Sequence, residues 1–267
     1  GTNNNAFGET ALFSNTTGGN NQAVGRGALE SNTTASNNSA FGHHALKANT
    51  TGNANVAIGG LAGDKVTTGG ANVLLGYSSG IFGTALTTGG TNTLIGSYTS
   101  PTTADASSAV GLGHSLAAAT GFTTIGHGNS DIRAAHGNVT WSTVSDERVK
   151  KDIEDSTVGL NFINDLRPVT FNYKNKCDLP TEFRGYKKDS IEVYKSKKSQ
   201  HGFIAQEVKA AIDKHSDIKN GFSMWDDDET GQQRVGETAV IPVMVKALQE
   251  LSAKNDALEA RLKTLEG

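Results

Sequence analysis

Several features that would fix the class of this protein at once are missing from its sequence. The 267 residues include one cysteine, Cys177, which excludes an internal disulfide framework. No apolar run is long enough to span a bilayer, and no signal-peptide pattern is present. The first methionine is Met224, so we expect the chain to be part of a longer protein. The formal net charge of -3 gives no reason to expect nucleic acid or a membrane as a partner.

Charge is also scarce in the first half of the chain. Within 1–128 only seven side chains carry a formal charge: Glu9, Arg26, Glu30, Lys47, Asp64, Lys65 and Asp105. Nearly all the remaining charge follows Ile132, and such a break is typical of a domain boundary. We predict a glycine-rich β-repeat domain at 1–128, a linker at 129–144 and a second domain at 145–267.

A triplet of a small or apolar residue, an apolar residue and glycine recurs through the first half. The glycines of five copies, each 17 residues after the last, are Gly8, Gly25, Gly42, Gly59 and Gly76. An asparagine stands four residues before each glycine, and Ala-Leu pairs and Asn-Thr-Thr sequences separate the triplets. Looser copies end at Gly96, Gly111 and Gly126. A fixed period of this kind is the signature of a repeat architecture.

The repeat unit is too long to be one strand, so each unit must turn at least once. Asn-Thr-Thr-Gly sequences supply turns, because glycine allows positive φ and asparagine side chains bond to their own backbone. Each triplet then forms a short strand with one apolar side chain to bury. A single coil buries little, whereas stacked coils share a core, which predicts a β-solenoid or β-roll. Three chains side by side would bury the remaining Phe, Val, Ile and Leu, which favours a homotrimer.

Two groups of residues in and after the repeats could indicate ligands but have a simpler explanation. Asn15, Asn32 and Asn49 match the glycosylation acceptor pattern, yet they sit where the repeat turns. The histidines are His43, His44, His114, His127 and His136, and no pair of them has a compelling metal-ligand spacing. We therefore expect no sugar, no metal and no cofactor.

The second half has the composition of an ordinary α+β domain. Apolar periodicity predicts a helix over 157–166, ended by Pro168, and a second helix over 202–212. Alternation from Val169 to Tyr173 predicts a strand. We expect a hairpin or long loop at 174–198 and an acidic, solvated turn at 225–229.

The C-terminus carries a heptad pattern that predicts a long coiled-coil helix. Positions a would be Ile241, Leu248, Asn255 and Leu262, and positions d would be Met244, Leu251, Leu258 and Leu265. An asparagine in such a seam fixes register at some cost in stability. The seam favours parallel self-association and leaves open the choice between two and three strands.

Three motifs in the second half occur in the order typical of one family. They are Ser-Asp-Glu-Arg-Val-Lys-Lys-Asp-Ile at 145–153, Leu-Arg-Pro-Val-Thr-Phe at 166–171 and Gly-Phe-Ile-Ala-Gln-Glu-Val at 202–208. From Ser145 to about Leu265 the chain resembles the endosialidase-type intramolecular chaperone, an auto-processing domain at the C-terminus of phage tailspikes and tail fibres. The repeats resemble those of phage tail fibres and of trimeric adhesin heads.

The resemblance implies a self-cleaving chaperone that trimerises the chain, lets the preceding β-structure fold and then releases itself. It implies a cut at the Val144–Ser145 bond by a single-turnover serine peptidase, with Ser145 as nucleophile and Lys150 as base and with no other catalytic activity. A lysine can be a base only when desolvation or a nearby cation lowers its pKa. Two side chains five residues apart do not face each other on a helix or on a strand. Ser145 and Lys150 can therefore meet only if a turn lies between them or if the lysine comes from another chain.

Neighbouring residues of the motif are expected to support the segment. Arg148 would position it, and Asp146 and Glu147 would favour the start of a helix.

The leading functional hypothesis is the tip of a trimeric viral tail fibre that recognises a glycan or protein on the host surface. The fibre would reside in the virion, and the chaperone would be released after assembly in the host cytoplasm. One alternative is a polysaccharide-degrading tailspike, which needs two juxtaposed carboxylates. The repeats offer only Glu9, Glu30, Asp64 and Asp105, none paired in sequence. A trimeric bacterial surface adhesin is the other alternative.

Overall fold

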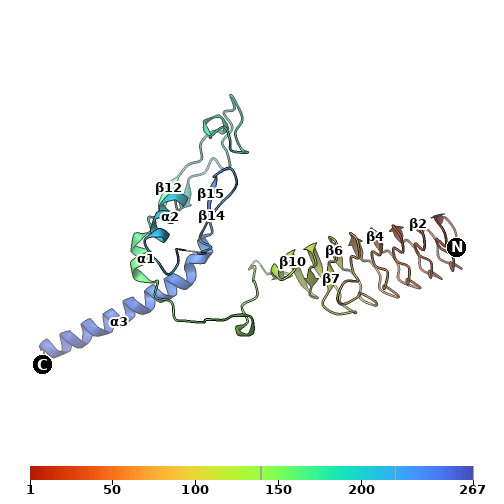
Figure 1. Cartoon of the computed structure of the whole chain (residues 1–267), viewed down its shortest axis with the longest axis horizontal. Helices are drawn as coiled ribbons and strands as arrows, with labels where there is room; N and C mark the ends of the chain where they lie inside the picture. Colours follow the sequence, from red (N-terminus) through yellow and green to blue (C-terminus); the bar gives the residue numbers. More distant parts are fainter. Residues whose placement is uncertain (139, 220, 267) are drawn as a thin grey trace. The chain divides into compact units, whose positions relative to one another are not determined.

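The computed structural model describes residues 1–138, 140–219 and 221–266, and it divides them into two compact units (Figure 1). The first unit is Gly1–Lys151 and the second is Asp152–Gly267. The predicted fold class is confirmed, because a β-solenoid is followed by an α+β region that ends in a long helix.

Strands from successive coils form one sheet along the solenoid, with the order β1-β2-β3-β4-β5-β6-β8-β10-β11 among the described residues, and all neighbours except β10 and β11 are parallel. Each of the first strands pairs with the strand 17 residues on, as Ala6 does with Ala23. The strands are β1 (Asn5–Phe7), β2 (Gln22–Val24), β3 (Ser39–Phe41), β4 (Val56–Ile58), β5 (Val73–Leu75), β6 (Thr93–Ile95), β8 (Val110–His114), β10 (Phe122–His127) and β11 (Ser130–Ala135). The repeat period therefore sets the register of the sheet.

Glycine ends the early strands because the neighbouring coil leaves no room for a side chain. Gly25 has φ +127°, and a Cβ there would lie 2.4 Å from the carbonyl oxygen of Gly42 on the next coil. Only glycine combines that backbone conformation with so close an approach. The 17-residue spacing of the glycines is thus a packing requirement between stacked coils.

The solenoid core contains the first residue of each triplet from β2 to β6, an alanine in the early coils and Leu74 or Leu94 in later ones, while the second residue lies outside. Ala23, Ala40 and Ala57 are fully buried, and the leucines of the Ala-Leu pairs, Leu29 and Leu46, belong to the same cluster. Each of these triplets thus buries one apolar side chain, as predicted. The second residues form an outer apolar row along the sheet: Phe7, Val24, Phe41, Ile58, Leu75 and Ile95.

Buried asparagines form a ladder at the start of the strands. The Oδ1 of Asn21 accepts the backbone N–H of Asn38 at 3.0 Å, and the Oδ1 of Asn38 accepts that of Asn55 at 2.9 Å. A second ladder links Asn32 to Asn49, whose side chains are fully buried and leave no room for a sugar. Among the described residues the Oδ1 of Asn49 has no partner, because Val66 occupies the next position of this ladder.

Asn38→Ala should destabilise the folded chain by about 2–4 kcal/mol, because it leaves the buried N–H of Asn55 without an acceptor. Denaturant unfolding measures the loss. The matched control is Asn53→Ala, since Asn53 accepts the N–H of Ser36 at 2.7 Å but is exposed, so water can replace it. A cost for Asn38→Ala no larger than that of the control would contradict a supporting role for the ladder.

The regular repeat changes toward the end of the solenoid. Val73 pairs with Thr93, 20 residues on, so the coil that begins at β5 is three residues longer than those before it. Two short strands, β7 (Ser100–Pro101) and β9 (Ala117–Ala118), pair separately. The last strand, β11, runs antiparallel to β10, and Arg133 forms a further bridge to Ser142. The sheet thus continues into the segment that the sequence analysis treats as a linker at 129–144.

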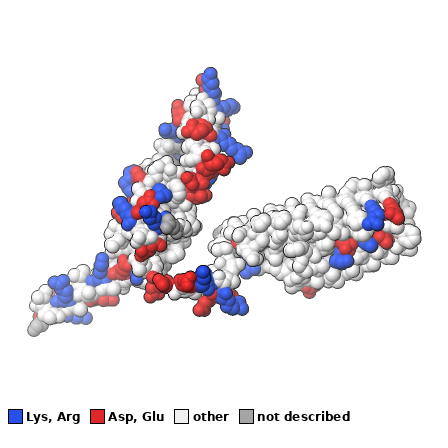
Figure 2. Space-filling model, viewed as in Figure 1, with Lys and Arg blue, Asp and Glu red and all other residues white. Residues whose placement is uncertain are grey.

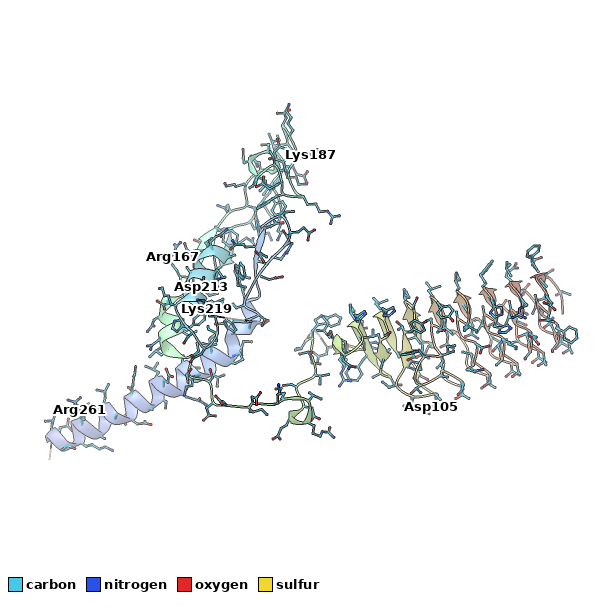
Figure 3. The ribbon with its side chains drawn as sticks, viewed as in Figure 1. Asp105, Arg167, Lys187, Asp213, Lys219 and Arg261 are labelled. Carbon is cyan, nitrogen blue, oxygen red and sulfur yellow. The ribbon has the colours of Figure 1, made fainter. Side chains whose placement is uncertain are left out.

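The second unit packs its elements around Phe162 and Met224, which are fully buried. The segment at 174–198 is a long loop with one bridge between Asn175 and Val193, and Figure 3 labels Lys187 near its tip. The elements are α1 (Leu160–Asp165), β12 (Val169–Phe171), η2 (Lys176–Asp178), β13 (Gln200–Gly202), α2 (Ala205–Asp213), β14 (Trp225–Asp227), β15 (Gln233–Val235), η3 (Glu237–Val240) and α3 (Ile241–Glu266). The two predicted short helices and the strand after Pro168 are present with different bounds: the helix predicted at 157–166 begins at Leu160, the one predicted at 202–212 begins at Ala205 because Gly202 ends strand β13, and the strand ends at Phe171.

The acidic turn predicted at 225–229 is in part wrong, because Trp225–Asp227 is strand β14 of a hairpin with β15. The turn lies just after it, where the Oδ1 of Asp228 accepts the backbone N–H of Thr230 at 3.0 Å and its hydroxyl at 2.6 Å. The hydrogen bond from the Thr230 side chain, with a further one from Arg234, lowers the pKa of Asp228 to about 2. The sequence did not predict this strand, because its charged residues do not show the alternation of apolar side chains that is typical of a strand.

Helix α3 carries two different apolar faces. Val243 and Ala247 are buried, and Val243 belongs to the core of the second unit. The residues of the predicted heptad seam point elsewhere and are about half exposed or more, for example Leu248 at 64% and Leu262 at 56%. None of the described helices combines the length and the apolar character needed to cross a membrane.

Candidate functional site

Ser145 and Lys150 lie in hydrogen-bond contact. A single 3-10 turn, η1 (Glu147–Val149), separates them, and the backbone N–H of Lys150 closes it on the carbonyl of Glu147 at 3.0 Å. The turn reverses the chain and brings the Nζ of Lys150 to 2.7 Å from the Oγ of Ser145. A turn within one chain is therefore sufficient to bring the two side chains together.

Contacts between Asp146, which precedes the turn, and Arg148, which lies within it, stabilise this turn. The Oδ1 of Asp146 accepts the backbone N–H and the Nε–H of Arg148, both at 2.9 Å. Mainly because of the side-chain hydrogen bond from Arg148, the pKa of Asp146 is lowered to about 2, and the same contact raises the pKa of Arg148. The carboxylate is thus engaged by Arg148, on the turn that aligns Ser145 with Lys150. The sequence analysis expected a helix start at Asp146 and a positioning role for Arg148, but not that the two are partners.

The pair is exposed in the single chain. Ser145 and Lys150 both lie on the surface, and the adjacent apolar side chains Val144 and Val149 are 59% and 69% exposed. Water therefore reaches the hydroxyl and the amine. The two side chains are thus brought into contact on the surface of the single chain.

The histidines of the solenoid stack in pairs. The rings of His43 and His44 lie 3.8 Å apart, and those of His114 and His127 lie 5.1 Å apart. Burial, followed by the charge of His43, lowers the pKa of His44. His, Cys, Asp and Glu side chains do not gather in threes as a metal site anywhere in the described ranges.

Two of the four carboxylates in the repeats lie beside lysines. Glu30 lies 3.8 Å from the Nζ of Lys47, and Asp64 lies 3.1 Å from that of Lys65.

One comparison with known proteins finds a match. Residues 145–217 match the family model described as the chaperone of endosialidase, a self-cleaving chaperone domain. The matched segment begins at Ser145 and includes α1, β12, β13 and α2. Searches of the curated proteins and of the solved structures give no match. The family match supports a C-terminal chaperone role for the second part of the chain.

Proposed function

We propose that this chain is the C-terminal part of a trimeric viral tail fibre, and that its chaperone drives assembly and then releases itself at the Val144–Ser145 bond. The observation that carries the proposal is the 2.7 Å contact between the Nζ of Lys150 and the Oγ of Ser145, at the residue where the chaperone match begins. The fibre recognises the host surface as part of the virion, and the chaperone stays behind in the host cytoplasm.

The cleavage needs the amine of Lys150 in its neutral form. The Nζ then takes the proton of the Ser145 hydroxyl while the Oγ attacks the carbonyl carbon of Val144. The bond between that carbon and the nitrogen of Ser145 breaks, the nitrogen takes up a proton, and an ester joins Val144 to the Oγ. One water molecule then hydrolyses the ester. The products are a Val144 carboxylate and a Ser145 with a free amine and its hydroxyl restored.

Assembly would control this chemistry through burial. Ser145, Lys150 and the flanking Val144 and Val149 are exposed in the single chain, and burial of an amine favours its neutral form. Neighbouring chains that cover the two valines would also exclude water from the amine. Cleavage then follows assembly, even though both residues belong to one chain.

Two exposed apolar surfaces support self-association. The first is the outer apolar row of the solenoid, in which Phe41 and Ile58 are 41% and 47% exposed although they occupy a sheet. The second is the seam of α3, which continues beyond the part of the helix packed against the core. Contiguous apolar surfaces of this kind mark interaction sites. Three copies around one axis would bury both surfaces, with strands and helices parallel.

The Ser145→Ala chain, which keeps both units together, should have a trimeric mass by light scattering at micromolar concentration. Ile58→Lys in that background should shift the mass toward monomers, because it puts three charges into the buried face. Thr51→Lys, at an exposed position outside the strands, is the matched control and should remain trimeric. A monomeric mass for the unsubstituted chain would overturn the proposed architecture.

Asp146→Ala should slow cleavage by about tenfold without abolishing it, because the turn loses its cap while the nucleophile and the base remain. Asp146→Asn keeps an acceptor for the N–H of Arg148 and should retain more activity. The cleaved fraction over time on denaturing gels measures both variants. The pH profile of cleavage should keep its shape, since Asp146 transfers no proton; a changed profile would assign it a different role.

A further inference from the structure

Aromatic rings form a continuous row on the outside of the later coils. The ring centroids of Tyr77 and Tyr98 are 5.5 Å apart, those of Tyr98 and His114 are 5.7 Å apart, and His114 continues to His127 at 5.1 Å. Phe82 packs on Tyr98 at 5.0 Å. We call these five residues the aromatic row. Stacked coils repeat at about 4.8 Å, so rings on successive coils are held next to each other by the sheet itself.

This row is a departure from the repeat rather than a part of it. Tyr77 and His127 directly follow the glycine of a triplet, a position held by Glu9, Arg26, His43 and Gly60 on the earlier coils, and His114 follows Gly113 at the end of strand β8. Phe82 belongs to the coil that is three residues longer than its predecessors. Insertions in repeat proteins map to loops on one face, which is often the binding face.

The rings do not serve the solenoid core. Tyr77 and Phe82 are about half exposed, and His114 and His127 are exposed, whereas the core residues of the same coils, Leu74, Leu86 and Leu94, are fully buried. Large aromatic side chains held in contact on a surface, without a packing role, are typical of a binding site.

The electrostatics of the row favour an uncharged ligand. Residues 66–104 contain no Asp, Glu, Lys or Arg, and the charged side chains visible on the solenoid lie mainly toward its N-terminal end (Figure 2). Asp105, the next charged residue, lies on the side of the solenoid away from the strands (Figure 3). Hydroxyl residues such as Ser97 and Ser115 flank the rings in the sequence. Exposed aromatic rings set among hydroxyls match a sugar, which has apolar C–H faces and polar edges.

We propose that the aromatic row binds a neutral oligosaccharide, with sugars packing on the exposed rings of Tyr77 and Phe82, which both rest against Tyr98. The proposal rests on the host-recognition role proposed above and names the chemical class of the receptor.

The test is binding of the full-length Ser145→Ala chain and of the cleaved wild-type fibre to an array of defined oligosaccharides. The array holds neutral hexose and N-acetylhexosamine chains together with sialylated and sulfated ones. We expect retention on neutral chains of several sugars and not on the anionic ones. Tyr77→Ala and Phe82→Ala should each weaken binding by about three- to tenfold. Both side chains are half exposed, so the variants should fold, as circular dichroism would verify.

Phe13→Ala is the matched control, because Phe13 is a strongly exposed aromatic residue of the first coil, outside the aromatic row. It should bind like the unsubstituted chain. The proposal is overturned if no neutral chain binds, if only anionic chains bind, or if Tyr77→Ala and Phe82→Ala bind as Phe13→Ala does. The mass and the cleavage of the same samples are measured in parallel. A cleaved trimer that binds no sugar refutes the ligand assignment alone, whereas an uncut monomer refutes the proposed fibre.

Discussion

Ser145→Ala should give chains that assemble and stay full length, with no detectable cleavage. The substitution removes the attacking oxygen and leaves the backbone of the η1 turn unchanged, so assembly does not suffer. Wild-type chains should split into residues 1–144 and a fragment that begins at Ser145. Denaturing electrophoresis shows the split, and N-terminal sequencing of the smaller fragment identifies the bond that was cut.

The base is tested by a pair of substitutions at Lys150. Lys150→Ala should not cleave, and Lys150→Arg should not restore cleavage, because a guanidinium does not give up its proton near neutral pH. Lys151→Ala is the matched control and should still cut. Normal cleavage of Ser145→Ala, or a fragment that begins at another residue, would show that a separate protease cleaves the chain or that Ser145 and Lys150 are not the catalytic pair.

A gene that ends at Val144 should produce aggregated or misfolded repeats. The sheet pairs residues 17 apart in the regular coils and buries mostly alanines, so each coil gains little until its neighbours are in place. Folds dominated by non-local strand pairing form slowly and expose apolar surface meanwhile. Without residues 145–267 the outer apolar rows of separate chains would meet at random rather than in register.

Removing the same residues after folding should have the opposite result. If a protease cuts an assembled Ser145→Ala chain near Val144, residues 1–144 should remain a stable trimer, because the folded rows are already buried. Size-exclusion chromatography compares the two preparations. Soluble trimers from the truncated gene would show that the second unit is dispensable for assembly.

The fold of the repeats could be predicted because the repeat period is visible in the sequence. The glycine spacing of 17 is the pairing distance of the strands. The direction of the side chains could not be predicted, because a strand of three residues is too short for its alternation to identify the buried face. Ala40 and Phe41 are both apolar, so the sequence does not show which of them is buried. The interior of the solenoid is narrow, and Ala40 is the one that lies inside.

The candidate site was predictable only in part. Resemblance pointed to Ser145 and Lys150, but a separation of five residues matches neither a helix nor a strand, so their contact depends on the η1 turn. The cap that forms this turn pairs Asp146 with Arg148, two residues apart. The aromatic row was not found from the sequence, since its residues come from coils of unequal length and follow no common period.

Strand β11 is the last strand of the solenoid sheet, and it would remain at the end of the solenoid after cleavage. A stack of parallel strands offers unpaired backbone groups to any similar stack, which invites end-to-end polymerisation. Here the last strand runs antiparallel, carries Asp131 and Arg133, and is itself partly covered by the bridge to Ser142. Charges on an exposed strand discourage pairing with another chain. Because this strand precedes Val144, a fibre cleaved there would keep its own terminal cap and would not grow into longer filaments.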